Sequence, residues 1–264
     1  MTNPQPRTPL AHLKMDNLLM PTEGRYLVPN AGSSKLFSQW RGPAPQLAYD
    51  QQFGSALTLP AHQGVGLNLG PEANPLSNFT FACWLRAEIR DGSAGTSEKN
   101  RDPLLEVEFR EVGGRYNNGL TLAVGSGIKL IDAERRQEIL SAPEISDWAD
   151  WHHIALTHGD NIWQVVVDGE QVAEAFSEAR IAVMPEDVGL ENLRETGAML
   201  AHIRLYAEPL TVEELRLDIM ADMASGATAV QAHTQYGEGL LLHLPLDQAK
   251  AGQILDFSGQ ENHG

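Results

Sequence analysis

Residues 151–172 read WHHIALTHGDNIWQVVVDGEQV, and this stretch decides the fold. Apolar residues fill positions 154–156 and 162–167, and β-branched types dominate the second run. An Asp-Asn pair at 160–161 and an Asp-Gly pair at 168–169 interrupt the pattern. An Asp-Gly pair tolerates the positive φ angles that a two-residue hairpin turn needs. The stretch therefore predicts three antiparallel strands joined by two tight turns, and it places the chain in the antiparallel β class.

The same residues resemble the W-x-H-[VI]-A … V-D-G signature of laminin-G-like jelly-roll domains, which are relatives of concanavalin A-like lectins and glucanases. Three further pieces of that signature follow in the family's order: FGSAL at 53–57, FTFACWL at 79–85, and IRLY at 203–206 with PLTVEEL at 209–215. The resemblance covers residues 50–215. It implies an all-β fold, an antiparallel β-sandwich of jelly-roll type, and it says much less about function.

The expected elements follow from local patterns. A capping box, TVEE at 211–214, predicts one short flanking helix that ends at Gly226. An apolar stripe should pack this helix on the sandwich: Val212, Leu215, Ile219 and Met223. Turn formers dominate residues 17–45, and we expect a long loop with a turn of helix at 177–195. Strands are expected at 47, 56–59, 65–69, 79–87, 104–110, 119–124 and 128–132.

The end of the chain repeats its beginning. HLPLDQ at 243–248 matches HLKMDN at 12–17, and DFSGQENHG at 256–264 resembles the opening D-x-S-G-x-x-N-x-G of a laminin-G-like domain. We therefore predict a jelly-roll domain at 1–225, a linker at 226–238, and at 239–264 the opening strand and turn of a second, incomplete repeat. The parent polypeptide would then be an array of such domains. The alternative is a strand that folds back onto the first domain.

Composition limits the partners. The 264 residues carry a formal net charge of −16 and a pI of about 4.9. This charge repels nucleic-acid phosphates and anionic lipid, but it suits cations, basic proteins and neutral glycans. Neither a secretory signal nor a run of membrane-spanning length is expected, so the localisation stays open. The single cysteine, Cys83, lies in an apolar strand pattern and is expected to be a buried small hydrophobe.

The sharpest enzymatic candidate is EVEFRE at 106–111. Related laminarinase-like glucanases carry E-[IL]-D-[IF]-x-E on a strand, and the resemblance implies a nucleophile and an acid among Glu106, Glu108 and Glu111. Alternation places Glu106 and Glu108 on one face, and a bulge would be needed to bring Glu111 there. Retaining glycosidases hold their two carboxyl groups about 5–5.5 Å apart. This sequence has Glu where the family has the middle Asp, and a charged, solvent-facing strand is the alternative.

No metal or cofactor is predicted, although calcium is considered because relatives use it. Oxygen ligands are available at strand ends and in loops: Asp16, Asn17, Asp132, Asp147 and Asp150. The first domain lacks the Asp of the D-x-S-G turn, since its counterpart reads VPNAG at 28–32. The adjacent His152 and His153 should point to opposite faces, with His153 packed beside Trp151, so they cannot share one ion.

Aromatic residues offer a route to sugar binding. Trp40, Trp148 and Trp163 are candidates for stacking on a sugar ring, whereas Trp84 and Trp151 sit in apolar strand patterns that predict core positions. We therefore expect a non-catalytic recognition or adhesion module that binds a glycan or a protein partner within a multi-domain protein. The alternatives are a structural spacer domain of a larger particle, and a glucanase-like enzyme built on Glu106, Glu108 and Glu111.

Overall fold

In the computed structural model, the stretch 151–172 lies in three consecutive antiparallel strands: β13 (His152–Gly159), β14 (Ile162–Val167) and β15 (Glu170–Phe176). Both turns contain residues with positive φ, which is 52° and 64° at Asp160 and Asn161 and 51° and 77° at Asp168 and Gly169. Asp, Asn and Gly enter this left-handed region more readily than other residues. The predicted meander and its two turns are confirmed.

The structure describes residues 7, 9, 11–13, 19–22, 25–29, 37–41, 46–68, 75–87, 102–111, 119–145, 147–177, 181–235, 249–250 and 253–254. The chain forms two units. The first comprises Met1–Ala48 and Ala56–Ile219, and the second comprises Tyr49–Ser55 and Met220–Gly264. Among the described residues, no helix is both long enough and apolar enough to cross a membrane.

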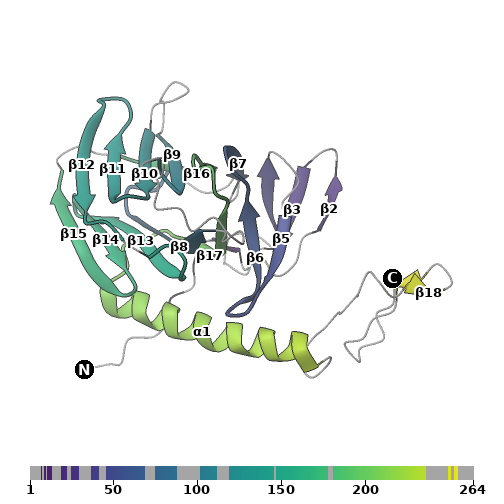
Figure 1. Ribbon diagram of the computed structural model, residues 1–264. Helices are drawn as coiled ribbons and strands as arrows, with labels where there is room; N and C mark the ends of the chain where they lie inside the picture. Colours follow the sequence, from purple (N-terminus) through teal and green to yellow (C-terminus); the bar gives the residue numbers. More distant parts are fainter. Residues whose placement is uncertain are drawn as a thin grey trace. The chain divides into compact units, whose positions relative to one another are not determined.

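An eight-stranded sheet, called sheet A, has the order β15-β14-β13-β8-β17-β6-β5, with β1 paired to β17 (Figure 1). Strand β17 runs antiparallel to β1, β6 and β8, strand β13 runs antiparallel to β8 and β14, and β14 runs antiparallel to β15. The remaining strands of sheet A are β1 (Ala11–Leu13), β5 (Gln46–Asp50), β6 (Gly54–Leu59), β8 (Phe79–Ala87) and β17 (Ala198–Tyr206).

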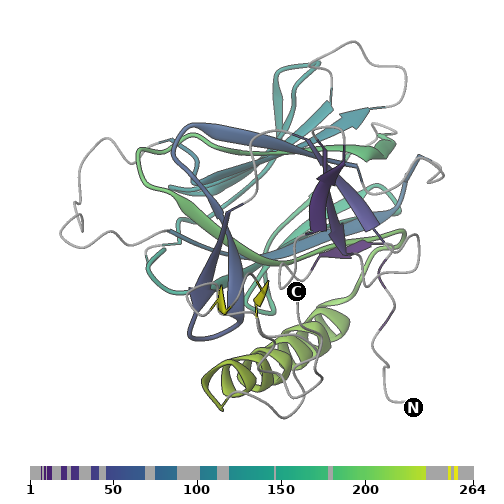
Figure 2. The same cartoon turned by 90° about the vertical axis from the view of Figure 1, so that its right-hand side faces the viewer.

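A nine-stranded sheet, called sheet B, has the order β12-β11-β10-β9-β16-β7-β4-β3-β2. Its strands are β2 (Leu19–Thr22), β3 (Arg25–Pro29), β4 (Phe37–Arg41), β7 (Gln63–Asn68), β9 (Leu105–Glu111), β10 (Gly119–Val124), β11 (Ile128–Asp132), β12 (Gln137–Ala142) and β16 (Val183–Asn192). Figure 2 shows the strands of the first unit in two layers.

The two sheets pack on one shared apolar core. Phe79 and Phe81 of β8 each place a ring centroid 5.5 Å from that of Phe109 of β9, so aromatic contacts join sheet A to sheet B. All three rings are buried, and burying one such side chain stabilises a fold by about 1.5–3 kcal/mol. Cys83 is buried as predicted, and burial raises the pKa of its thiol to about 12. The expected antiparallel β-sandwich is confirmed.

Helix α1 (Val212–Gln235) follows the last strand of the sandwich. The predicted capping box is present: Glu214 Oε2 accepts the Thr211 N–H at 2.9 Å, and the Glu214 N–H donates to Thr211 Oγ1 at 3.3 Å. Within the first unit, Leu215 packs with an apolar cluster on the outer face of sheet A that includes Ala155 and Val166.

The predicted end of this helix is wrong. Helix α1 continues through Gly226 to Gln235, so residues 226–235 of the predicted linker are helical. Met223, placed on the packed stripe by its spacing, is 44% exposed. In the second unit, Gln52 Nε2 lies 3.0 Å from Met223 Sδ.

Two segments predicted to be loops are strands. Residues 183–192 form β16, which pairs with β7 on one side and β9 on the other. The turn-rich stretch 17–45 contains β2, β3 and β4. Most of the opening strand and turn predicted at 239–264 lies outside the described residues. Further on, β18 (Ala249–Lys250) pairs with β19 (Gln253–Ile254).

Candidate functional site

The acidic strand β9 presents Glu106 and Glu108 on the outer face of sheet B. Their neighbours Leu105, Val107 and Phe109 are buried, so alternation turns the two glutamates away from the core. Glu106 is half-buried, and Glu108 is exposed. This part of the sequence prediction agrees with the structure.

A third carboxylate comes from a strand that the sequence did not predict. In the register of β16 against β9, Glu191 lies opposite Glu106, and Gly189 lies opposite Glu108. Burial raises the pKa of Glu106, and the carboxylates of Glu108 and Glu191 raise it further. On β7, Gly64 and Gly66 lie opposite Glu191 and Gly189. The outer face of sheet B therefore has three acidic side chains beside positions without side chains.

The glucanase hypothesis required a bulge in β9 to bring Glu111 onto this face. Between Leu105 and Arg110, β9 pairs with β10 in one continuous register. The shift in pairing against β9 instead lies on β16, between Val183 and Val188. The described pairing thus gives no bulge in β9 that would unite Glu106, Glu108 and Glu111, so the condition that this alternative required is not met in the paired part of β9.

The outer face of sheet A has a different character where β14 and β15 pair. We call the residues Ile162, Gln164, Gln171, Glu174 and Phe176 the β14–β15 face. Ile162 lies opposite Phe176, and Gln164 lies opposite Glu174. Phe176 is 67% exposed and Ile162 is 37% exposed. Glu174 Oε2 accepts hydrogen bonds from Gln164 Nε2 at 2.8 Å and from Gln171 Nε2 at 3.1 Å.

The tryptophans predicted to stack on sugars do not supply that surface. Trp163 is fully buried and stacks on His158, with ring centroids 3.8 Å apart. Trp148 is buried too, and its Nε1 donates to the Gly125 carbonyl at 3.0 Å. Both predictions are therefore wrong, and the side chain of Trp40 lies outside the described residues.

The two tryptophans predicted to be core residues differ from each other. Trp84 is buried as expected, and the ring of His153 packs against it with centroids 5.3 Å apart. Trp151 is only half-buried, and the Arg86 guanidinium lies 5.0 Å from its ring centroid. His153 is thus a packed strand residue as predicted, but the ring it packs on belongs to Trp84.

The residues considered for calcium do not converge. Asp132 accepts the Arg135 N–H at 2.8 Å and forms an ion pair with the Arg135 guanidinium. Asp147 Oδ1 accepts the Ala149 N–H at 3.1 Å. In the part of the chain that the structure describes, neither of these carboxylates nor Asp150 belongs to a group of three acidic or histidine ligands close enough to share an ion. Asp16 and Asn17 lie outside the described residues.

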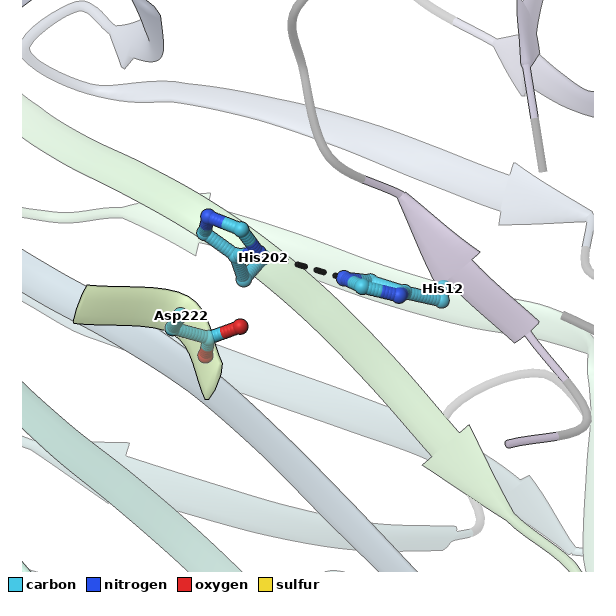
Figure 3. A group of neighbouring side chains, drawn as sticks. All are labelled: His12, His202 and Asp222. Carbon is cyan, nitrogen blue, oxygen red and sulfur yellow. Dashed lines mark hydrogen bonds between the residues drawn. The ribbon is translucent and has the colours of Figure 1, made fainter. Parts of the chain in front are cut away.

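Two histidines far apart in sequence meet in the first unit. His12 Nε2 of β1 lies 3.2 Å from His202 Nδ1 of β17, and Figure 3 shows the two rings; it also draws Asp222 of the second unit. His202 has a φ of 47°, at the register shift of β17 against β8. For this hydrogen bond, one ring nitrogen must donate and the other must accept. The spacing also suits two nitrogen ligands of a tetrahedral zinc ion, which stand roughly 3.3 Å apart.

His152 is held by hydrogen bonds at both ring nitrogens. Nδ1 lies 2.7 Å from Asp168 Oδ2, and Nε2 lies 2.7 Å from the Asp147 carbonyl oxygen. Both partners are acceptors, so both nitrogens donate when the ring is protonated. Burial lowers the pKa of His152, but the bonds to Asp168 and Asp147 outweigh burial and raise it overall. This group links the turn after β14 to the segment before β13.

Comparison with known proteins finds similar structures but no related sequence. No known family profile matches this chain, and no curated protein matches it. The binding domain of botulinum neurotoxin serotype G is similar in structure, with a TM-score of 0.57, 13% identity, and coverage of 81% of this chain and 51% of that one. The ligand-binding domain of serotype D, solved in complex with N-acetylneuraminic acid, has a TM-score of 0.55, 11% identity and coverage of 81% and 51%.

A third similar structure is the binding domain of Paraclostridial Mosquitocidal Protein 1, with a TM-score of 0.54, 13% identity, and coverage of 81% of this chain and 52% of that one. This chain therefore spans about half the length of the structures it matches. At such low identities, the likeness shows the shared β-sandwich fold.

Proposed function

We propose that this chain is a non-catalytic recognition module that binds a glycan or a protein partner. The observation that carries the proposal is the β14–β15 face, where exposed apolar side chains lie beside hydrogen-bonded polar groups on a paired sheet. Surfaces of this kind bind ligands without a chemical step, because they offer contact area and fixed hydrogen-bond partners. The similar solved structures support the proposal, since they are binding domains and one of them was solved with N-acetylneuraminic acid.

The acidic face of sheet B lacks part of the residue set that the glucanase alternative requires. A glycosidase needs one protonated and one ionised carboxyl group placed on either side of the sugar bond. On this face the set of three carboxylates that the glucanase resemblance implies is incomplete, because the paired part of β9 has no bulge that would add Glu111. The resemblance of residues 50–215 to laminin-G-like domains points the same way, because that family's modules serve in adhesion. As part of the proposal, we assign this chain to the laminin-G-like jelly-roll domains.

The domain arrangement is a proposal as well. Residues 1–225 would be one laminin-G-like module, 226–238 a connecting segment, and 239–264 the start of the next repeat in an array. The net charge of −16 favours neutral or cationic partners and disfavours nucleic acid.

The test is binding to an array of immobilised glycans, together with an assay of β-glucan hydrolysis. We expect saturable binding to at least one glycan and no turnover. Saturable binding would exclude the alternative of a purely structural spacer. The proposal fails if the chain binds neither a glycan nor a protein in a co-purification from its source, or if it hydrolyses β-glucan and the Glu106→Gln variant does not.

A further inference from the structure

We propose that the β14–β15 face binds one uncharged sugar ring of a neutral glycan, with Phe176 stacking on the ring and Gln164 and Glu174 bonding its hydroxyl groups. This inference rests on the proposed recognition function and names its ligand class and its site. The three residues lie on two adjacent strands of the first unit.

The first argument is the position of the apolar group. Phe176 and Ile162 are opposite each other at the end of the β14–β15 pair, on the face that carries Gln164 and Glu174. Exposure of 67% is high for a phenylalanine, and it leaves the ring open to an approaching ligand. The C–H groups on one face of a pyranose form an apolar surface, which suits contact with an aromatic ring.

The second argument is the spacing of the polar groups. Residues two apart on one strand are separated by roughly 6.8 Å, and neighbouring strands are about 4.8 Å apart. A sugar ring over Phe176 therefore extends its hydroxyl groups to the next row, which holds Gln164 and Glu174. One ligand of that size can use both rows at once.

The third argument is that the polar groups are oriented before a ligand arrives. Glu174 Oε2 is bonded to both Gln164 and Gln171, so three side chains form one network. Among the described residues, the network leaves Glu174 Oε1 to accept a hydrogen bond, and it leaves the second N–H of each amide to donate one. Sugar hydroxyls both donate and accept, so they match this mixed set. Fixed partners also reduce the entropy cost of binding.

The charge of the face selects the sugar. Glu174 lies on this face, and the chain as a whole has a net charge of −16. A carboxylate or sulfate on the sugar would meet like charge next to Phe176. Neutral hexoses and N-acetylhexosamines avoid this repulsion.

The side chain of Pro209 lies along one side of the face. Ile162 lies opposite Gly159 of β13, where an added Cβ would lie 2.6 Å from Pro209 Cγ. Pro209 therefore borders the face beyond Gly159. The ligand is confined to the region over β14 and β15, next to the edge of sheet A.

The test uses an array that pairs neutral glycans with their sialylated forms, for example lactose with 3′-sialyllactose. The full chain should bind neutral members more strongly than sialylated ones. Phe176→Ala should weaken this binding roughly tenfold or more, the loss of about 1.4 kcal/mol, and Gln164→Ala should weaken it too. Tyr49→Ala is the matched control, because Tyr49 is an aromatic residue that is 46% exposed and lies on β5, at the other end of the strand order of sheet A. This control should bind like the wild type.

The possible results of this experiment distinguish failure of the proposed sugar site from failure of the proposed recognition function. Binding to glycans that survives Phe176→Ala and Gln164→Ala overturns this inference and leaves the recognition function standing. Preference for the sialylated forms also overturns it. If no glycan binds and only a protein partner is captured, the sugar site is wrong and the module binds protein. Circular dichroism and melting of each variant show whether it is folded, which the exposure of Phe176 leads us to expect.

Discussion

The carboxylate of Asp168 binds His152 through the ring, with Oδ2 2.7 Å from Nδ1, and its other oxygen accepts the backbone N–H of His153 at 2.8 Å. One side chain at the tip of a turn thereby fixes the start of the neighbouring strand β13. Asp168, which belongs to the Asp-Gly pair that predicts the turn, is thus also the hydrogen-bond partner of His152 and His153 at the start of the meander. Because the Asp168 carboxylate is bonded to the His152 ring, the stability of the meander depends on the charge of His152.

Replacing His152 should change how stability depends on pH. Its pKa is raised in the folded state, so its contribution is fully present below the pKa of the unfolded chain and is lost as pH rises through the folded value. We expect His152→Gln to lower stability by about 1–2 kcal/mol at pH 5.5 and by less at pH 8.5. Urea unfolding at several pH values measures this difference.

The control for His152 is a variant of the other turn of the meander. Asp160 also has a positive φ, of 52°, but within the described part of the chain its carboxylate is not bonded to a histidine ring. Asp160→Asn should leave the pH profile unchanged, whereas Asp168→Asn should reproduce the loss seen in His152→Gln. An equal pH effect in the Asp160 and Asp168 variants would contradict the assigned role.

Removing charge from Glu106 should stabilise the fold at neutral pH. Its pKa is raised by burial and by Glu108 and Glu191, so the folded protein loses stability as pH rises from the unfolded pKa through the folded one. We expect Glu106→Gln to gain about 0.5 kcal/mol at pH 7.5 and almost nothing at pH 3, where the carboxyl group is protonated in both states. Glu138→Gln is the control on the same sheet.

Glu138 differs because it pairs with Lys129 at 3.2 Å on the exposed surface. Its replacement should be neutral or slightly destabilising, since exposed ion pairs contribute about 0–1 kcal/mol. A gain in both variants would mean that general reduction of negative charge, rather than the Glu106–Glu191 register, is responsible.

A buried histidine should make the core sensitive to acid. His158 stacks on Trp163 with an interplanar angle of 17°, and among the described residues neither of its ring nitrogens has a hydrogen-bond partner of normal geometry. Burial lowers the pKa of His158, although the nearby backbone of Ser77 raises it in part. The unfolded chain therefore binds the proton more readily, and stability falls as pH drops below the unfolded pKa.

The variant His158→Phe keeps a ring on Trp163 and removes the titrating group. We expect the fall in melting temperature between pH 7.5 and pH 5 to be smaller than in the wild type. The comparison uses the difference between two pH values, because a larger ring in a packed core can shift stability by a constant amount. An unchanged pH dependence would show that His158 does not titrate in this range.

The sequence predicted those parts of the fold that depend on local pattern. The meander at 151–172 and the capping box at Thr211 are set by residues close together in the chain. The strand β16 was missed because Pro185, Glu186 and Asp187 resemble a loop, and its pairing with β7 and β9 is long-range. The helix end at Gly226 was wrong because one glycine costs a helix only about 1 kcal/mol.

The candidate site was harder to predict for the same reason. Glu191 meets Glu106 only through sheet register, and His12 meets His202 across 190 positions of sequence. The β14–β15 face did have a local signal. Gln164 marks the outward positions of β14, which places Trp163 inside, and Glu174 marks those of β15, which places Phe176 outside.

The turn at Gly169 should tolerate no side chain. Its φ is 77°, and an added Cβ would lie 2.8 Å from Arg216 Cγ, while the Arg216 Nε–H donates to the Gly169 carbonyl at 2.8 Å. Gly169→Ala therefore combines an unfavourable backbone conformation with a clash against the first unit's part of α1, and we expect a loss of about 1–3 kcal/mol. Gly64→Ala is the control, since its Cβ would meet only ordinary contacts, at 3.5 Å or more. Chemical unfolding of both variants checks this, and an equal effect would show that neither φ nor Arg216 restricts position 169.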